Sequence, residues 1–286
     1  MDPRRTGLFV LGLLAIFLAA VGIGSALEPA DTDSGVGAHG MEEETHGAHQ
    51  EPASHAPAGL AVAEDGYALR FDRTHLRKGE PGELRFTVVA DSGAPVTGFD
   101  ELHERRLHLI LVRRDGTGFR HLHPEMDAAG AWSVPAEFPA AGAYRVFADF
   151  SVGGEQRTLA ADLFVSGGEF EARPFPPPAA ADTTAGYEVR LRSDHLAAGE
   201  PAALTFAVGR DGEPVGDLAP YLGAKGHLVA LREGDLAFLH VHPEPGGVGE
   251  VPFAATFPSA GRYRLYLQFR HDGTVRTAEF TVEVSR

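Results

Sequence analysis

The chain has 286 residues, no cysteine and a formal net charge of −15 at pH 7. This length gives room for two ordinary domains, and the absence of cysteine excludes disulfides, thiolate metal sites and cysteine nucleophiles. The negative charge argues against binding through bulk electrostatic attraction to phosphates, so no nucleic-acid partner is expected.

The chain begins with an apolar segment behind two positive charges. Arg4 and Arg5 precede an uncharged run over residues 7–27, which is about the length that crosses a bilayer. Residues 1–27 are therefore predicted as a signal anchor or signal peptide, and their length favours an uncleaved anchor in the membrane. The positive-inside rule then makes the rest extracytoplasmic, anchored to the cell membrane, or secreted if residues 1–26 are cleaved.

Residues 28–60 form an acidic segment rich in Pro, Ala and Gly, without hydrophobic periodicity, which predicts a disordered linker. Four histidines lie in it: His39, His46, His49 and His55. They are either incidental residues of a solvated linker or weak ligands in a metal-capture arm. The histidine clusters further along the chain favour the second interpretation.

A long internal repeat follows the linker. The segment Tyr67-Ala-Leu-Arg-Phe recurs as Tyr187-Glu-Val-Arg-Leu, and a proline-rich connector, Arg173-Pro-Phe-Pro-Pro-Pro178, lies between the two copies. The repeat predicts two homologous domains with a connector between them: residues 61–168, 169–183 and 184–286.

Both copies consist of short alternating segments separated by Gly, Pro and Asp turns. The first copy predicts strands near 67–72, 83–90, 107–113, 118–123, 132–137, 143–150 and 157–165. The second predicts them near 187–192, 203–208, 226–232, 237–242, 251–256, 262–269 and 275–284. About seven short strands in about 100 residues predict a sandwich. The expected fold class is all-β, with two tandem immunoglobulin-like antiparallel β-sandwich domains after an N-terminal transmembrane or signal helix.

The first copy carries a histidine pattern that suits a metal ion. His108 precedes the turn dipeptide Asp115-Gly116, and His121 and His123 follow it. A tight hairpin at this turn places His108 opposite His123, with His121 two residues away on the same face. Opposed residues have Cβ atoms about 5 Å apart, so three imidazoles are expected to converge.

The second copy repeats the pattern with His227, the turn Gly234-Asp235, His240 and His242. A strand histidine is more often a packed or surface residue than a ligand. Retention of all three histidines in both diverged copies nevertheless favours a metal site in each domain. His75 and His195 match one another but stand alone at strand ends, which indicates a structural role. His103 and His271 have no histidine counterpart in the other copy and are outside the repeated set.

The candidate ligands limit which metal ions could bind. Imidazoles without a thiolate suit Cu(II), zinc or nickel and argue against a blue-copper electron carrier. Glu125 and Glu244 follow the motif directly and are candidates for a fourth ligand or for orienting an imidazole. Met126 occurs only in the first copy and is at most a local addition. Prolines 124 and 243 end the strands, which places each site near solvent at one end of its sandwich.

The stretch Gly226-His227-Leu, followed by Leu239-His240-Val241-His242-Pro243, resembles a group of secreted or membrane-anchored bacterial proteins common in actinobacteria. These proteins are similar to YtkA-like and other immunoglobulin-like or cupredoxin-like domains that are linked to copper and heavy-metal handling. The resemblance covers both copies and implies fold and location. The first copy departs from the pattern, with Phe99-Asp-Glu-Leu-His103-Glu in place of Gly216-Asp-Leu-Ala-Pro220-Tyr221, so equal function of the two domains is left open.

The sequence thus predicts a protein, not an enzyme, that binds, buffers or delivers an extracytoplasmic divalent metal ion, with copper favoured and zinc possible. One alternative is a metal-free cell-surface interaction module in which the histidines are hydrogen-bonded structural pairs. A metal-dependent hydrolase or oxygenase is the least favoured, because no repeated general base or substrate cleft is apparent. The expected partners are the metal ion and, through the N-terminal helix, the membrane; no protein partner is indicated.

Overall fold

The computed structural model describes residues 57–239 and 241–286, apart from the side chain of His242. The predicted anchor and nearly all of the predicted linker lie outside these residues. Ser54–Arg286 forms one compact unit. Within the described ranges there is no helix of the length and apolar character needed to cross a membrane.

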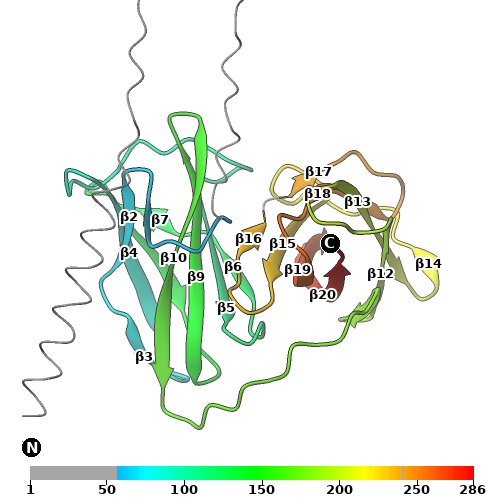
Figure 1. Cartoon of the computed structure of the whole chain (residues 1–286), viewed down its shortest axis with the longest axis horizontal. Helices are drawn as coiled ribbons and strands as arrows, with labels where there is room; N and C mark the ends of the chain where they lie inside the picture. Colours follow the sequence, from blue (N-terminus) through cyan, green and yellow to red (C-terminus); the bar gives the residue numbers. More distant parts are fainter. Residues whose placement is uncertain (1–56, 240) are drawn as a thin grey trace, which may run out of the picture. The chain divides into compact units, whose positions relative to one another are not determined.

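The first half of this unit is a sandwich of two five-stranded sheets (Figure 1). One sheet has the order β1 (Ala63–Glu64), β2 (Tyr67–Phe71), β4 (Gly82–Ala90), β8 (Ala131–Ala136) and β7 (Glu125–Met126). The other has the order β3 (His75–Arg77), β10 (Glu155–Ser166), β9 (Gly142–Val152), β5 (Leu107–Arg113) and β6 (Arg120–Leu122). All neighbours are antiparallel except β3 and β10, which run parallel.

The second half repeats this arrangement. One sheet has the order β11 (Ala181–Thr184), β12 (Tyr187–Ser193), β13 (Pro201–Arg210), β18 (Glu250–Thr256) and β17 (His242–Pro243), with β14 (Glu213–Pro214) also paired to β13. The facing sheet has the order β16 (Phe238–Leu239), β15 (Gly226–Arg232), β19 (Gly261–His271) and β20 (Thr274–Val284). The protein therefore consists of two tandem immunoglobulin-like β-sandwiches, as the sequence predicted.

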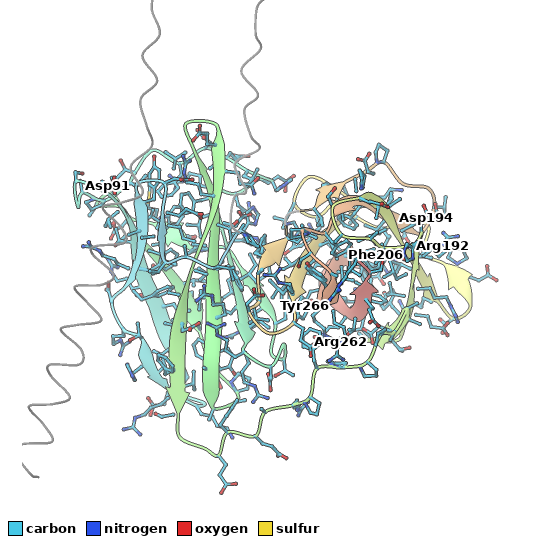
Figure 2. All side chains as sticks on the ribbon, in the orientation of Figure 1. Asp91, Arg192, Asp194, Phe206, Arg262 and Tyr266 are labelled. Atoms are coloured by element: carbon cyan, nitrogen blue, oxygen red, sulfur yellow. The ribbon has the colours of Figure 1, made fainter. Side chains whose placement is uncertain are left out.

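Alternation along the strands builds each core. In β4, Leu84, Phe86 and Val88 point inward and pack in the first core with Trp132 of the neighbouring strand β8. The second core contains the equivalent Phe206, labelled in Figure 2. Strand β5 departs from simple alternation, because all seven of its residues are buried. A strand buried on both faces must have a second packing partner besides its own core.

The second sandwich supplies that partner. The outer faces of β5 and β15 meet in an apolar cluster of residues from both halves: Ile110, Val112, Phe147, Ala160, Val229, Leu231, Leu236, Phe238 and Tyr266. Phe119 stacks on Tyr266 with ring centroids 4.2 Å apart, and Phe147 meets Phe238 at 5.5 Å. Phe119 and Phe238 occupy equivalent positions of the repeat, as do Phe147 and Tyr266. The contact is therefore isologous, as in a two-fold symmetric dimer.

The chain enters the first sandwich through this contact. The amide of Phe238 donates to the carbonyl of Ala58 at 2.8 Å, and the amide of Gly59 donates to Thr158 at 3.0 Å. Gly59 has φ of 72°, and a Cβ at this position would lie 2.7 Å from the Phe147 ring. Only glycine fits there without displacing the interface.

The first histidine hairpin has the predicted register. Leu109 pairs with Leu122 and Ile110 with His121, so the ladder brings His108 opposite His123. The predicted two-residue turn is wrong, however. The amide of Gly116 donates to Arg113 and that of Arg113 donates to Thr117, both at 2.8 Å, which closes a three-residue loop. Gly118, also at positive φ, adds one residue and restores the register.

The second hairpin is shorter than predicted. Strand β16 ends at Leu239 instead of continuing to His242. The backbone of His242 pairs with Ala254 of β18, in the opposite sheet of the sandwich. The expected backbone pairing of His242 with His227 is therefore wrong, because the chain crosses between the sheets before it reaches His242.

Candidate metal centre

Five histidines gather where the outer faces of the two sandwiches meet: His103, His108, His121, His123 and His227. Distances between neighbouring ring centroids range from 4.7 Å, between His121 and His227, to 6.1 Å, between His103 and His108. The first four belong to the first sandwich and His227 to the second. We call this group the histidine cluster.

The location of the cluster differs from the prediction. His108 and His227 lie on the outer faces of β5 and β15, in line with the apolar residues of the interface. His108 is only 1% exposed, and the other members are half-buried. Alternation shows which residues share a face but not what covers that face, so histidines near solvent were expected where a cluster shared by the two sandwiches is found.

Three hydrogen-bonding contacts run through the cluster in series. Nε2 of His108 lies 2.8 Å from the carbonyl oxygen of Leu102. Nδ1 of His108 lies 2.9 Å from Nε2 of His121. Nδ1 of His121 lies 2.7 Å from Oε1 of Gln268, a residue of the second sandwich.

The Leu102 carbonyl determines the tautomer of His108, and the orientation of the Gln268 amide determines that of His121. A carbonyl oxygen only accepts, so Nε2 of His108 carries the hydrogen that it donates to Leu102. With Gln268 oriented as above, Nδ1 of His121 likewise donates to Oε1. In neutral rings the remaining nitrogens, Nδ1 of His108 and Nε2 of His121, then both carry lone pairs and face one another.

Both rings favour the neutral form. Burial lowers the pKa of His108. Burial, with His108 and His123 adding to it, lowers the pKa of His121 well below its usual value. Burial also lowers the pKa of His123, to about 4, with His108 and Arg105 contributing. With Gln268 in this orientation, no proton lies between the facing nitrogens of the neutral rings, and their lone pairs are available to a metal ion.

A third nitrogen donor lies within reach. His108, His121 and His227 each offer one ring nitrogen, and these three atoms lie within 4.8 Å of one another. Two nitrogens bound to one ion at about 2.0–2.1 Å are at most about 4.2 Å apart. At a separation of 4.8 Å, ligation by all three rings would require the widest pair to close by at least about 0.6 Å.

His123 is the fourth imidazole beside this group. Its ring centroid lies 4.8 Å from that of His121, and its Nε2 is buried without a hydrogen-bond partner among the described residues. An unsatisfied buried nitrogen costs free energy, and a metal ion would satisfy it.

His103 is a member that the sequence did not predict. It lies in a tight turn closed by reciprocal backbone hydrogen bonds between Leu102 and Arg105, with φ of 49°. Its counterpart in the second copy is Leu222, so the comparison of the repeats excluded it. The same turn positions the Leu102 carbonyl that receives the His108 hydrogen bond.

Two polar residues beside the histidine cluster had no signal in the sequence. Asp149 on β9 is the direct cross-strand partner of His108, and Gln268 on β19 is that of His227. Asp149 is 3% exposed, and burial raises the pKa of its carboxyl group. It accepts hydrogen bonds from Gln156 Nε2 at 3.1 Å and from Thr158 Oγ1 at 2.9 Å.

The remaining predicted ligands are not part of the cluster as described. Glu125 and Glu244 are exposed, and Glu125 lies on β7 in the opposite sheet. Met126 packs against the first core. Five candidates fall outside the described residues, and for a sixth, His242, only the backbone is described: His39, His46, His49, His55 and His240.

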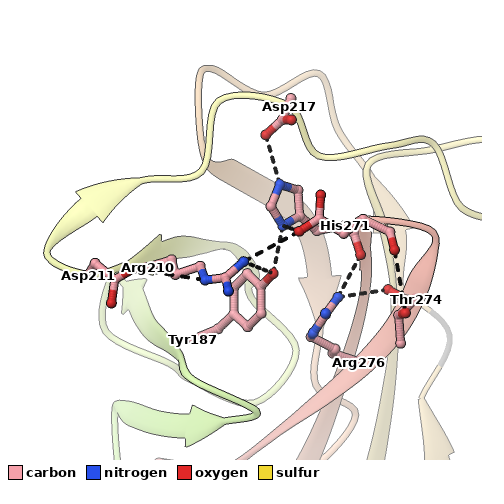
Figure 3. Close-up of polar contacts among 8 residues, drawn as sticks. Tyr187, Arg210, Asp211, Asp217, His271, Thr274 and Arg276 are labelled. Carbon is pink, nitrogen blue, oxygen red and sulfur yellow. Dashed lines mark hydrogen bonds and ion pairs between the residues drawn. The ribbon is translucent and has the colours of Figure 1, made fainter.

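The second sandwich holds a histidine with ordinary structural bonding, shown in Figure 3. His271 accepts from the Tyr187 hydroxyl through Nδ1 at 2.6 Å and donates through Nε2 to Asp217 at 2.8 Å. One ring nitrogen accepts and the other donates, so a single neutral tautomer satisfies both contacts. The histidine cluster differs. In the bonded pair His108 and His121, the outer nitrogen of each ring faces an oxygen acceptor, and the two inner nitrogens face one another.

Comparison of the sequence with known families shows that both repeats match one family of domains. A family described as a domain of unknown function, DUF8832, matches residues 61–167 and 181–286. The chain belongs to the DUF8832 family. Each match contains one sandwich, so the shared cluster is built from residues of two DUF8832 domains. No curated protein matches the chain.

Several solved structures resemble the DUF8832 pair at low similarity. The Escherichia coli adhesin FdeC has 16% identity and a TM-score of 0.28, covering 79% of this chain and 66% of that one. The Yersinia pseudotuberculosis adhesin InvE has 11% and 0.24, covering 76% and 58%. A titin immunoglobulin tandem has 13% and 0.21, covering 78% and 99%. Likenesses of this size carry no argument about function.

Proposed function

We propose that this protein binds a divalent metal ion, with copper favoured over zinc, at the histidine cluster between its two sandwiches. Its role is to buffer or deliver the ion outside the cytoplasm. We propose binding rather than catalysis, because the polar groups beside the cluster, the Leu102 carbonyl and the Gln268 side-chain amide, already bond to the imidazoles and orient them.

The facing nitrogens of His108 and His121 carry the proposal. Each of these rings directs its other nitrogen to an oxygen acceptor, at 2.8 and 2.7 Å. Histidines that ligate metals characteristically donate their second N–H to a carbonyl, an amide or a carboxylate, which fixes the ring and its tautomer. The 2.9 Å between the facing nitrogens is compatible with two ligands of one ion at about 2.0–2.1 Å each.

The donor set supports copper or zinc. Imidazole nitrogens suit both ions, and the chain has no cysteine to offer a softer ligand. The copper preference and the extracytoplasmic, membrane-anchored location rest on the resemblance to metal-handling surface proteins and on the apolar run at 7–27. The histidines of the linker fit the same role as a capture arm.

Calorimetric titration of Ser54–Arg286 with Cu²⁺ and Zn²⁺ tests the proposal. We expect saturable binding at one shared site that is lost in His108→Ala and His121→Ala. His195→Ala is a matched control, because His195 contacts Ser285 at the far end of the second sandwich and should not affect binding. Absence of saturable binding to the wild-type fragment would contradict the metal-binding function.

A metal-free interaction module is the second candidate, and one feature favours it. If the Gln268 amide is rotated, its NH₂ donates to His121, His121 donates to His108, and His108 donates to Leu102. That neutral chain needs no metal ion.

Gln268→Glu separates the two candidates, because a carboxylate accepts but cannot donate. A metal site should retain or gain affinity, since His121 then donates to a charged acceptor. In the metal-free chain the same substitution should lower the free energy of unfolding by about 1–3 kcal/mol. Chemical denaturation and metal titration of this variant provide the two measurements.

A further inference from the structure

The two repeats place different side chains beside equivalent histidines. Asp149 opposes His108 across β5 and β9, and Gln268 opposes His227 across β15 and β19. Gln268 is neutral and contacts His121 in the other sandwich. Asp149 introduces an acidic group at the corresponding position, and the metal-binding function proposed above does not yet assign it a role.

The carboxylate is held close to the cluster. Directly opposed residues on neighbouring strands share a face and have Cβ atoms about 4.5–5.5 Å apart, so Asp149 lies on the same side of the sheet as His108. Gln156 bonds to both of its oxygens and Thr158 to one of them. At 3% exposure, water contributes little to the stabilisation of its charge.

The carboxylate would in turn act on a bound ion. Neutral imidazoles leave the full charge of a bound cation in a poorly solvated interface. A neighbouring carboxylate offsets it, and the attraction is proportional to the charge of the ion. We propose that Asp149 is the counter-charge that makes the histidine site selective for a divalent over a monovalent cation.

This proposal rests on the proposed function, and the competing explanation is structural. Asp149 links β9 to β10 through its bonds to Gln156 and Thr158. If that were its whole role, its removal would affect all ions equally, through the fold, and would lower the melting temperature of the apoprotein.

The test compares Cu²⁺ with Cu⁺, the latter under anaerobic conditions, by competition with chelators of known affinity. In Asp149→Asn of Ser54–Arg286 we expect the Kd for Cu²⁺ to rise about 10- to 100-fold, as for other residues that support metal ligands. The Kd for Cu⁺ should rise only by about the square root of that factor, because the attraction scales with charge.

Two further variants define the mechanism. Adding Gln268→Glu to Asp149→Asn returns a negative charge to the opposite side of the cluster and should restore the preference for Cu²⁺. Asp162→Asn is the matched control: this acid on β10 pairs with Arg114 and Arg145, and its removal should leave both affinities unchanged.

The outcomes are distinguishable. Equal losses for Cu²⁺ and Cu⁺, or no loss for either, would overturn the counter-charge role while leaving metal binding intact. Failure of the wild-type fragment to bind either ion would overturn the proposed function and this inference with it. A selective loss for Cu²⁺ that is rescued by Gln268→Glu supports both.

Discussion

His108 and His227, which occupy equivalent positions of the two repeats, stack on one another with ring centroids 5.7 Å apart and an interplanar angle of 18°. Equivalent residues meet in this way only when two similar surfaces pack face to face. The histidine cluster is thus a property of the domain pair, and neither sandwich contains it alone.

Substitution of His227 tests this shared character. We expect His227→Ala to raise the Kd for Cu²⁺ at least about 10-fold, because the ring lost from the second sandwich is a ligand of the site on the first. Isothermal titration of Ser54–Arg286 measures the effect. Two independent sites, of which His227→Ala removes one and leaves the other at full affinity, would instead support separate sites in each domain.

The aromatic contact between the domains should control metal affinity at a distance. Phe119→Ala removes the ring stacked on Tyr266 and should cost about 2–4 kcal/mol of unfolding free energy. It should also weaken Cu²⁺ binding, since the interface assembles the cluster. Phe164→Ala is the control, because Phe164 is 48% exposed and stacks on His75 of the first sandwich. Unchanged affinity in Phe119→Ala would show that the cluster forms without this contact.

The stability of the protein should be sensitive to a single methyl group added at Gly59, where the chain enters the first sandwich. Gly59→Ala places a Cβ 2.7 Å from Phe147 and 2.9 Å from Phe238, at a φ of 72°. We expect a loss of about 2–4 kcal/mol in denaturant unfolding, from backbone strain together with overpacking. Gly79→Ala is a matched control with φ of 70° and open space around the added Cβ, so it reports the strain alone. Equal losses in the two variants would contradict the close packing at Gly59.

The stability of the metal-free protein should fall with acidification. Burial lowers the pKa of His123 to about 4, whereas an unfolded histidine titrates near pH 6.5. Between these values the unfolded chain binds protons that the folded protein does not, so the free energy of unfolding decreases as the pH falls from about 6.5 to 4. His108 and His121, whose pKa values are also lowered by burial, act in the same direction.

Thermal unfolding at pH 7 and pH 5 measures this dependence. The melting temperature of His123→Gln should fall less than that of the wild type, because its side chain does not titrate. Asp149 acts in the opposite direction, since burial raises its pKa and the folded protein binds its proton more tightly. The comparison is therefore best repeated in Asp149→Asn. An equal pH dependence in wild type and His123→Gln would mean that His123 is solvated.

The sequence by itself determined the features that depend on neighbouring residues and on the repeat. Period-two alternation and the turn residues predicted two β-sandwiches. The same signals placed His121 and His123 on one face and set the register that opposes His108 to His123, even though the turn has a different form. These properties are local: side chains two residues apart on a strand share a face, whatever the rest of the chain does.

The tertiary structure alone decided what lies opposite that face. Strand β5 is apolar on both sides, which indicates a second partner, but periodicity does not name it. His103, Asp149 and Gln268 join the cluster from a turn and from two strands far along the chain, and only the packing of one sandwich on the other brings Gln268 to His121. Contacts between distant segments depend on the complementarity of whole surfaces, and local sequence patterns carry no record of it.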